Sequence, residues 1–347
     1  MPGQDPAAKY FRLVLVCTVI AFGLVLFSLY TRMADANPGC SAWSGCYGKP
    51  FAPLTAREIY EARRDSVPPA DAQRAKAWRD ALCRYLSGIF GLALMGLAYR
   101  GRQLARPRRS SQFVLPAVAA VFALLQTGLG LAAGRIPGPF SALVGLAAGV
   151  TVLALLWWVA LREQRIWKSV PDHPRIRHLR VRAVVALALV AGVVLLGGWT
   201  AANNAGLACP DFPTCQGGWW PVMDFADGFM LWRSPGLAHL GGMLDLAGIT
   251  AIDVAHRVAA LIVLLYVGWL ALRTMRVGYD SNLCRYGMLV LVLLLGETVA
   301  GVMDIVLRMP LMVAVVHGAA GVLLLLSLVT LNHVLRPQRH RAETRIR

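Results

Sequence analysis

Charged residues are scarce in this sequence of 347 residues: they make up 15% of it, whereas 57% of the residues are hydrophobic. Because a soluble domain has about 25% charged residues, this scarcity excludes an ordinary soluble protein and indicates a polytopic membrane protein. Acidic residues are rarer than basic ones, with 18 Asp and Glu against 35 Lys and Arg. The resulting charge of +17 does not indicate a nucleic-acid-binding protein, because the basic residues lie between apolar segments, as positive-inside topology requires.

Eight apolar segments are long enough to cross a bilayer, which takes about 20 residues. We predict an all-α polytopic membrane protein with eight transmembrane helices, at 12–31, 81–99, 113–133, 140–161, 183–203, 250–272, 286–307 and 311–334. Most basic residues fall at the two termini and in the second, fourth and sixth loops, so we expect both termini in the cytoplasm. The first segment lacks a small-residue cleavage site, so we expect a membrane span there and no cleaved signal peptide.

An internal repeat relates the two halves of the chain, with corresponding residues about 170 positions apart. The corresponding pairs include Cys40 and Cys209, Cys46 and Cys215, Cys83 and His256, Gln126 and Glu297, and Gly145 and His317. Four spans in each half keep both copies in one orientation. We therefore predict two pseudo-symmetric four-helix bundles side by side, the first half at 1–170 and the second half at 171–347.

Histidine is absent from the first half; His256 and His317 lie well inside apolar segments, whereas His333 lies at the cytoplasmic boundary of the last one. His256 and His317 each lie in the first one or two turns of a segment that enters from the outer face, so the two imidazoles share one depth. Such a pair predicts axial ligands of a heme iron, the alternative being that each bonds a carbonyl or a neighbouring helix. Arg257 would pair with a heme propionate or else reach the lipid headgroups.

Four of the seven cysteines lie in outward-facing loops, as the pairs Cys40 with Cys46 and Cys209 with Cys215. In an oxidising compartment we expect one disulfide in each loop. Metal binding and redox-active thiols are the alternatives.

Acidic residues inside apolar segments are costly and point to a role. Glu297 lies in the middle of the seventh segment, where it would relay protons or bond a neighbouring helix. Asp80 and Asp253 lie three residues before Cys83 and His256, where a side chain can cap a helix N-terminus. We expect that capping role for Asp253.

The motifs resemble the heme A synthase family over nearly the whole chain. The stretch from Gly197 to Pro221, with Cys209 and Cys215 inside it, is similar to the family's second-half loop. The residues 250–257 and 313–317 resemble its second-half ligand motifs, and 39–48 its first-half loop.

The resemblance implies eight transmembrane helices and a specific reaction. Such proteins oxidise a methyl group of heme O to the formyl group of heme A for cytochrome oxidase. Heme b would lie between His256 and His317, and the substrate heme between a first-half histidine pair with a nearby glutamate. The implied setting is the bacterial inner membrane, with the heme O-producing enzyme and the oxidase assembly machinery as partners and a homo-oligomer left open.

This sequence departs from the family in the first half. Cys83 and Gly145 stand where the family has histidines, and Asp80 stands where it has the glutamate. A Cys83 thiolate and an Asp80 carboxylate are the candidate catalytic groups that remain. The alternative to an enzyme is an inactive heme b-binding relative in electron transfer or oxidase assembly. A transporter is less favoured, because no Gly/Pro-interrupted helix pair marks a midplane site.

Overall fold

The computed structural model of the chain is all-α in the part that it describes, which is 6–36, 70–104, 111–131, 138–163, 174–231, 244–277 and 281–336. Its long helices are α1 (Pro6–Ala36), α3 (Ala70–Leu104), α4 (Ser111–Leu131), α5 (Gly138–Glu163), α6 (Pro174–Ala202), α9 (Leu246–Val277), α10 (Ser281–Val306) and α11 (Leu311–Val334). A single-turn helix, α7 (Phe225–Gly228), follows the loop after α6.

Seven of these helices are long and apolar enough to cross a membrane: α1, α3, α5, α6, α9, α10 and α11. The predicted third segment, 113–133, corresponds to α4, whose apolar stretch Gln112–Gly128 is shorter. The predicted start of the second segment is confirmed, because the apolar span of α3 begins at Ala81. The helix itself starts at Ala70, because a polar helical extension precedes its apolar part and hydropathy alone does not detect it.

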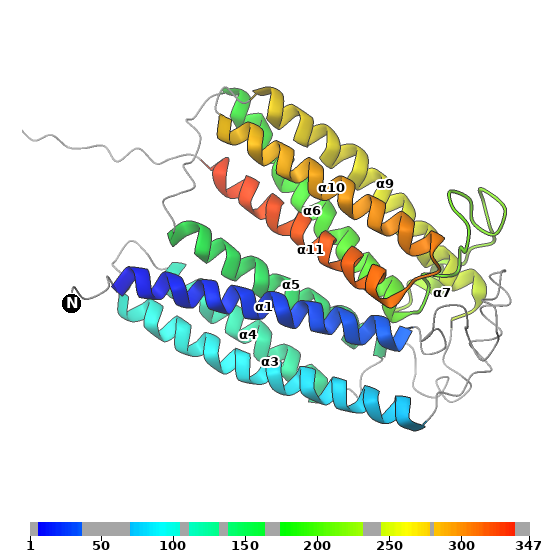
Figure 1. The fold of residues 1–347 in the computed structure, drawn as a ribbon, viewed down its shortest axis with the longest axis horizontal. Coiled ribbons are helices and arrows are strands. Elements are labelled where there is room, and N and C mark those ends of the chain that lie inside the picture. Colours follow the sequence, from blue (N-terminus) through cyan, green and yellow to red (C-terminus); the bar gives the residue numbers. More distant parts are fainter. Residues whose placement is uncertain are drawn as a thin grey trace, which may run out of the picture.

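The long helices pack in two groups, drawn below and above each other in Figure 1. In the first group α1 packs on α3, α3 on α4, α4 on α5, and α5 on α1. In the second group the same closed order joins α6, α9, α10 and α11. The groups meet through α1 and α5 on one side and α6 and α11 on the other. Each group is therefore a four-helix bundle with two of its helices at the shared interface.

Polar side chains contribute to the contact between the two groups. The indole nitrogen of Trp157 in α5 donates to the hydroxyl of Thr330 in α11, at 2.9 Å. Within the second group, the Asn332 amide of α11 donates to the carbonyl of Ala183 in α6, also at 2.9 Å. Such interhelical hydrogen bonds fix the register of helices that have no water to bond with.

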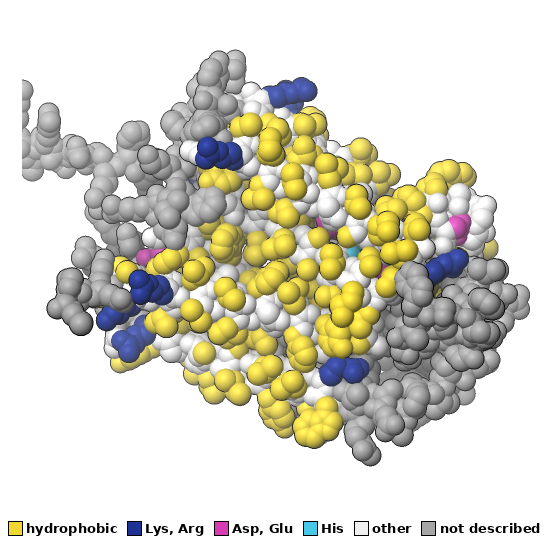
Figure 2. All heavy atoms as spheres, in the orientation of Figure 1, with side chains coloured by type: hydrophobic (Ala, Val, Ile, Leu, Met, Phe, Trp, Pro, Cys, Tyr) yellow, Lys and Arg dark blue, Asp and Glu magenta, His cyan; other side chains and the backbone are white. Residues whose placement is uncertain are grey.

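The outer surface of the bundles is apolar along most of its length, with Lys and Arg gathered toward the ends (Figure 2). Large hydrophobic side chains point outward from both groups, for example Val19, Ile89 and Leu265, each 65% exposed. Exposed apolar side chains at this density are the expected lipid-facing surface of a membrane protein, and would be a liability in water. The lipid bilayer is therefore the surroundings of this chain.

The close approach of α9 and α10 depends on Gly287. A Cβ added there would lie 2.8 Å from the carbonyl oxygen of Ala271 and 2.6 Å from Cγ of Met275. We expect Gly287→Ala to push the helices apart and to lower the free energy of unfolding by about 1–3 kcal/mol. Thermal unfolding of the purified protein in detergent measures the effect.

Gly296→Ala on the same helix is the matched control, because no atom lies within 4 Å of its added Cβ. It should be neutral or stabilise the helix by up to about 1 kcal/mol. Equal midpoints for the two variants would show that Gly287 does not set the distance between α9 and α10.

Candidate functional site

His256 of α9 and His317 of α11 lie in the same four-helix group, the second one. Each imidazole rests against a glycine of another helix of that group. A Cβ on Gly197 of α6 would lie 3.1 Å from Cε1 of His256, and a Cβ on Gly301 of α10 would lie 2.9 Å from Cε1 of His317. The two rings are close enough for the charge of one to act on the other. The missing side chains at the two glycines thus make room for the two imidazoles.

The ring of His317 is oriented by Glu297 of α10. Its Nδ1 lies 3.3 Å from the backbone carbonyl oxygen of Glu297 and 3.6 Å from the carboxylate oxygen Oε1. A proton on Nδ1 donates to that carbonyl and leaves Nε2 with a free lone pair. Glu297 was predicted either to relay protons or to bond a neighbouring helix. Its contacts with His317 show that it does contact the neighbouring helix α11.

Nδ1 of His256, Nε of the adjacent Arg257 and Oδ1 of Asp304 are buried without a hydrogen-bond partner among the described residues. Asp304 of α10 is close enough to His317 for their charges to interact. Hydropathy had singled out Glu297 but not Asp304, although an acidic residue in the apolar segment 286–307 is the same kind of signal. Unpaired buried polar atoms in a folded protein usually mark a site for a ligand or an ordered water.

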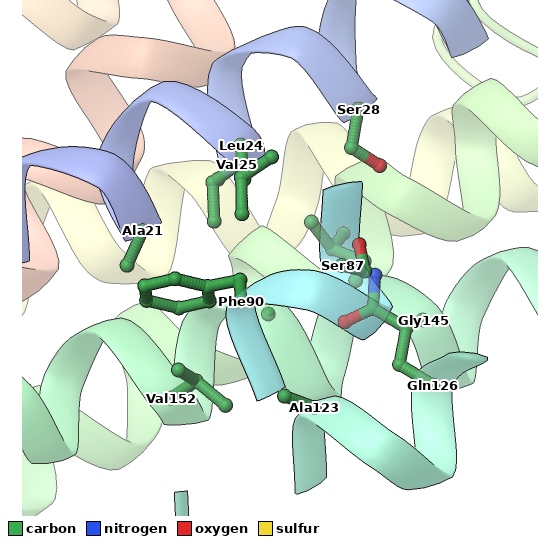
Figure 3. Close-up of a pocket in the computed structure, with 12 residues that line it drawn as sticks. Ala21, Leu24, Val25, Ser28, Ser87, Phe90, Ala123, Gln126, Gly145 and Val152 are labelled. Carbon is green, nitrogen blue, oxygen red and sulfur yellow. The ribbon is translucent and has the colours of Figure 1, made fainter. Parts of the chain in front are cut away.

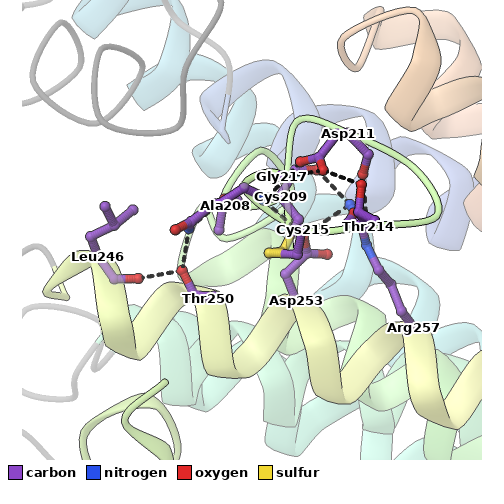
Figure 4. Close-up of polar contacts among 11 residues, drawn as sticks. Ala208, Cys209, Asp211, Thr214, Cys215, Gly217, Leu246, Thr250, Asp253 and Arg257 are labelled. Carbon is purple, nitrogen blue, oxygen red and sulfur yellow. Dashed lines mark hydrogen bonds and ion pairs between the residues drawn. A yellow bond between two sulfur atoms is a disulfide. The ribbon is translucent and has the colours of Figure 1, made fainter. Parts of the chain in front are cut away.

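The residues that flank His256 hold the loop between α6 and α7 (Figure 4). Asp253 accepts a hydrogen bond from the backbone N–H of Cys209 at 3.1 Å and pairs with Nη2 of Arg257 at 3.3 Å. Nη1 of Arg257 donates to the carbonyls of Asp211 and Thr214, at 2.8 and 3.0 Å, and Nη2 donates to the carbonyl of Cys209. One helical turn of α9 therefore binds both ends of the loop 209–215.

The loop itself is closed by a disulfide between Cys209 and Cys215, which confirms the predicted pairing. Inside it the Asp211 carboxylate accepts hydrogen bonds from the Thr214 hydroxyl and from the backbone N–H groups of Gln216 and Gly217. Burial acts to raise the pKa of Asp211, but these hydrogen bonds outweigh it and the pKa lies below its ordinary value. The hydrogen bonds therefore favour the ionised carboxylate.

A model of the COX15-CtaA family, described as cytochrome oxidase assembly protein, matches residues 11–329. The chain belongs to this heme A synthase family. A heme A synthase of Shewanella oneidensis is 32% identical to it over 325 residues, which cover 93% of this chain and 95% of that protein. Heme A synthases of Nitrosospira multiformis and Chelativorans sp. are 26% and 25% identical, over 96% and 90% of this chain and 95% and 88% of theirs.

Heme is the cofactor that this family suggests, and the second group has residues that fit it. Imidazole nitrogens are the usual axial ligands of a b-type heme iron. A ligating histidine generally donates its other ring N–H to a carbonyl or carboxylate, as Nδ1 of His317 can to Glu297. His256 has a buried Nδ1 without a partner and a glycine against its ring. The donors His256 and His317 therefore suit a heme of the heme A synthase family.

The first group differs at every position that corresponds to these residues. Cys83 of α3, which forms no disulfide, and Gly145 of α5 correspond to the two histidines. A Cβ on Gly145 would lie 3.0 Å from Nη2 of Arg32, so an arginine of α1 occupies the space beside it. Arg32 also donates to Ser28 Oγ at 3.3 Å and to the carbonyl of Ala142.

A cavity of about 30 Å³ lies in this region of the first group, lined by Ser28, Ser87, Gln126 and Gly145 together with apolar side chains (Figure 3). That volume suits a water molecule and is far smaller than a heme. One of its lining residues, Gly145, is the position that corresponds to His317 in the internal repeat. A substrate bound here would therefore have to displace side chains of α1, α3, α4 and α5.

The predicted capping role of one aspartate was wrong, and the structure excludes the same role, left open above, for a second. Asp253 does not cap α9, because the helix begins at Leu246, seven residues earlier. Asp80 lies ten residues inside α3, so it does not cap that helix either. The apolar run of α9 begins at Leu246 and not at 250 as predicted, whereas in α3 a polar stretch extends the helix outward from Ala81 to Ala70. The predicted pairing of Cys40 with Cys46 lies outside the described residues, as does the side chain of Asp80.

Replacement of Asp253 by asparagine tests the contact between α9 and the loop. The amide keeps the shape but removes the charge that faces Arg257 in a largely buried pair. We expect Asp253→Asn to lower the free energy of unfolding by about 3 kcal/mol, the usual cost of leaving a buried charge unpaired. The unfolding midpoint in detergent reports it.

Asp224→Asn is the control, since Asp224 is an exposed aspartate that caps the short helix α7. It should cost about 1 kcal/mol or less. If Asp253→Asn were no more harmful than Asp224→Asn, the clamp on the loop would contribute little to stability.

Proposed function

We propose that this chain is a heme A synthase-type membrane oxidoreductase, which oxidises a methyl group of heme O to the formyl group of heme A. Heme b lies between His256 and His317 in this proposal. The observation that carries it is the placement of both imidazoles in one four-helix group, each against a glycine of a neighbouring helix. The names of the relatives, which match along nearly the full length of both proteins, support the reaction.

The polar residues around the proposed heme b site each have a separate role. Nε2 of His256 and of His317 would hold the heme iron, and Glu297 contacts the His317 ring at Nδ1. Heme b, when bound, supplies a group that accepts and donates single electrons. Arg257 uses Nη1 and Nη2 on the loop, so its buried Nε is the donor that remains for a heme propionate. The loop closes the outer end of the group above His256.

The first helix group, where the substrate heme would bind, lacks the histidine ligands that the family has. Asp80 and Cys83 are the catalytic residues in this proposal, with the Cys83 thiolate in place of one family histidine. The opposite position, Gly145, offers no ligand, and Arg32 lies beside it. That contact favours a second candidate function: a heme b-binding relative without the reaction, which acts in electron transfer or in the assembly of cytochrome oxidase.

The architecture of the proposal follows the internal repeat. We propose eight transmembrane helices in two pseudo-symmetric halves, 1–170 and 171–347, supported by the same closed packing order in both helix groups. The proposed location is the bacterial inner membrane with both termini in the cytoplasm, supported by the basic residues in the even-numbered loops. Partners in this setting are the enzyme that makes heme O and the oxidase assembly machinery, and the chain can self-associate through its apolar outer surface.

The product of the reaction distinguishes the two functions. The chain is expressed with a source of heme O in a host without its own heme A synthase, and the extracted hemes are separated by chromatography. Heme A in the extract is the expected result. Heme b bound to the purified protein with no heme A in the extract would replace the enzymatic function by the second candidate.

Removal of either imidazole tests the cofactor site independently of turnover. We expect His256→Ala and His317→Ala to abolish the heme b absorption of the purified protein, because each removes one axial ligand. Cys83→Ala is the control and should leave that absorption unchanged, since Cys83 belongs to the other helix group. A normal heme b spectrum in both histidine variants would show that the cofactor lies elsewhere.

A further inference from the structure

A second cavity lies far from the histidine pair, between the first turns of α6 and the last turns of α9. Its volume is about 500 Å³, and it is lined by His178, Leu179, Arg182, Arg273, Arg276 and Val277. Four of these six side chains are basic and none is acidic. The cavity therefore gathers positive charge from two helices at one end of the second group.

An indole ring brings two of these charges close together. The guanidinium carbons of Arg182 and Arg273 lie 4.9 and 5.8 Å from the centre of the Trp269 ring. Tyr266 packs beside Trp269 at 5.9 Å, and its hydroxyl donates to the carbonyl of Arg182 at 3.3 Å. Cation–π contacts stabilise each arginine singly, but they leave the repulsion between the two positive charges uncompensated.

No acidic side chain among the described residues forms an ion pair with any of the four basic residues of this cavity. Elsewhere in the same helix, Arg257 has Asp253 as a partner within 3.3 Å. A cluster of like charges in a cavity is stabilised by an anion from outside the chain. The planar guanidinium group suits the oxygens of a phosphate, which it can bind through two parallel hydrogen bonds.

We propose that this basic cavity binds the phosphate of an anionic membrane phospholipid. Exposed apolar side chains adjoin the basic ones on both helices, with Val181 68% exposed on α6 and Leu272 45% exposed on α9. They offer a surface for acyl chains that a free phosphate ion would not use. Trp269 and Tyr266 are residues typical of the boundary between headgroups and hydrocarbon, and basic pockets between transmembrane helices are a known type of headgroup site.

The lipid site is separate from the histidine pair. Arg273 follows His256 by 17 residues in one continuous helix, which corresponds to about 25 Å along its axis. Bound lipid would join the start of α6 to the end of α9, two helices that pack on each other. Its effect is therefore on the stability of the second group and not on the ligands of the iron.

Lipid binding to the purified full-length chain tests the proposal. Native mass spectrometry measures the affinity for phosphatidylglycerol and for phosphatidylcholine, and thermal unfolding is followed with each lipid and with inorganic phosphate. We expect phosphatidylglycerol to bind more tightly than phosphatidylcholine. We also expect phosphatidylglycerol to raise the unfolding midpoint, and phosphatidylcholine and inorganic phosphate not to raise it. The variant Arg273→Gln with Arg276→Gln should bind that lipid about tenfold more weakly or worse, with unchanged heme b absorption.

Removal of two charges elsewhere is the matched control. Arg100→Gln with Arg102→Gln takes the same charge from α3 outside the cavity, and should keep the affinity for phosphatidylglycerol. The single variant Arg276→Gln covers the case in which the double variant fails to fold, because Arg276 has no hydrogen bond or ring contact among the described residues. Three results would each overturn the proposal: full protection by inorganic phosphate, equal affinity for the two lipids, or unchanged phosphatidylglycerol affinity in the cavity variants.

Discussion

A polar group inside a bilayer has no water to bond with, so it must find its partners within the protein. Much of this structure follows from that constraint. Buried threonines such as Thr18 and Thr274 donate to carbonyls one turn earlier in their own helices. Asp253 and Arg257, each too costly to bury alone, pair with each other and bind the loop 209–215. The position of that loop and the position of His256, between these two residues, therefore depend on each other.

Because buried polar groups in a bilayer must find partners within the protein, those without a hydrogen-bond partner point to a ligand or an ordered water. His256 lies ten residues inside α9, and its Nδ1 is buried without a partner among the described residues. The ring of His317 is held through Nδ1 on Glu297, which leaves its other nitrogen available. The adjacent Arg257 uses Nη1 and Nη2 on the loop, but its buried Nε is also without a partner among the described residues. A heme iron on Nε2 of both rings, as proposed, would leave Nδ1 of His256 in need of a further partner, such as an ordered water.

Hydropathy was sufficient to locate the eight long helices, seven of which are long and apolar enough to cross a membrane. The spacing of two cysteines in one outward-facing loop was sufficient to predict the Cys209–Cys215 disulfide. Hydropathy was insufficient for the helix starts: a polar stretch extends α3 outward to Ala70, and the apolar run of α9 begins at Leu246 and not at 250. The capping error at Asp253 followed directly from that limit. The clamp of Arg257 on the loop joins residues more than 40 positions apart, and no local pattern predicts such a contact.

The two helix groups share a packing order but differ in what lies at their centres. The first group is held by apolar side chains, with Leu94 and Leu153 fully buried, and its corresponding ligand positions carry Cys83 and Gly145. Imidazoles contribute little to such a core, so their absence leaves the bundle intact. Arg32 fills the space beside Gly145 and satisfies itself on Ser28 and Ala142. The residues that make the fold are thus distinct from those that would hold a substrate, and a family match along the whole chain depends mainly on the former.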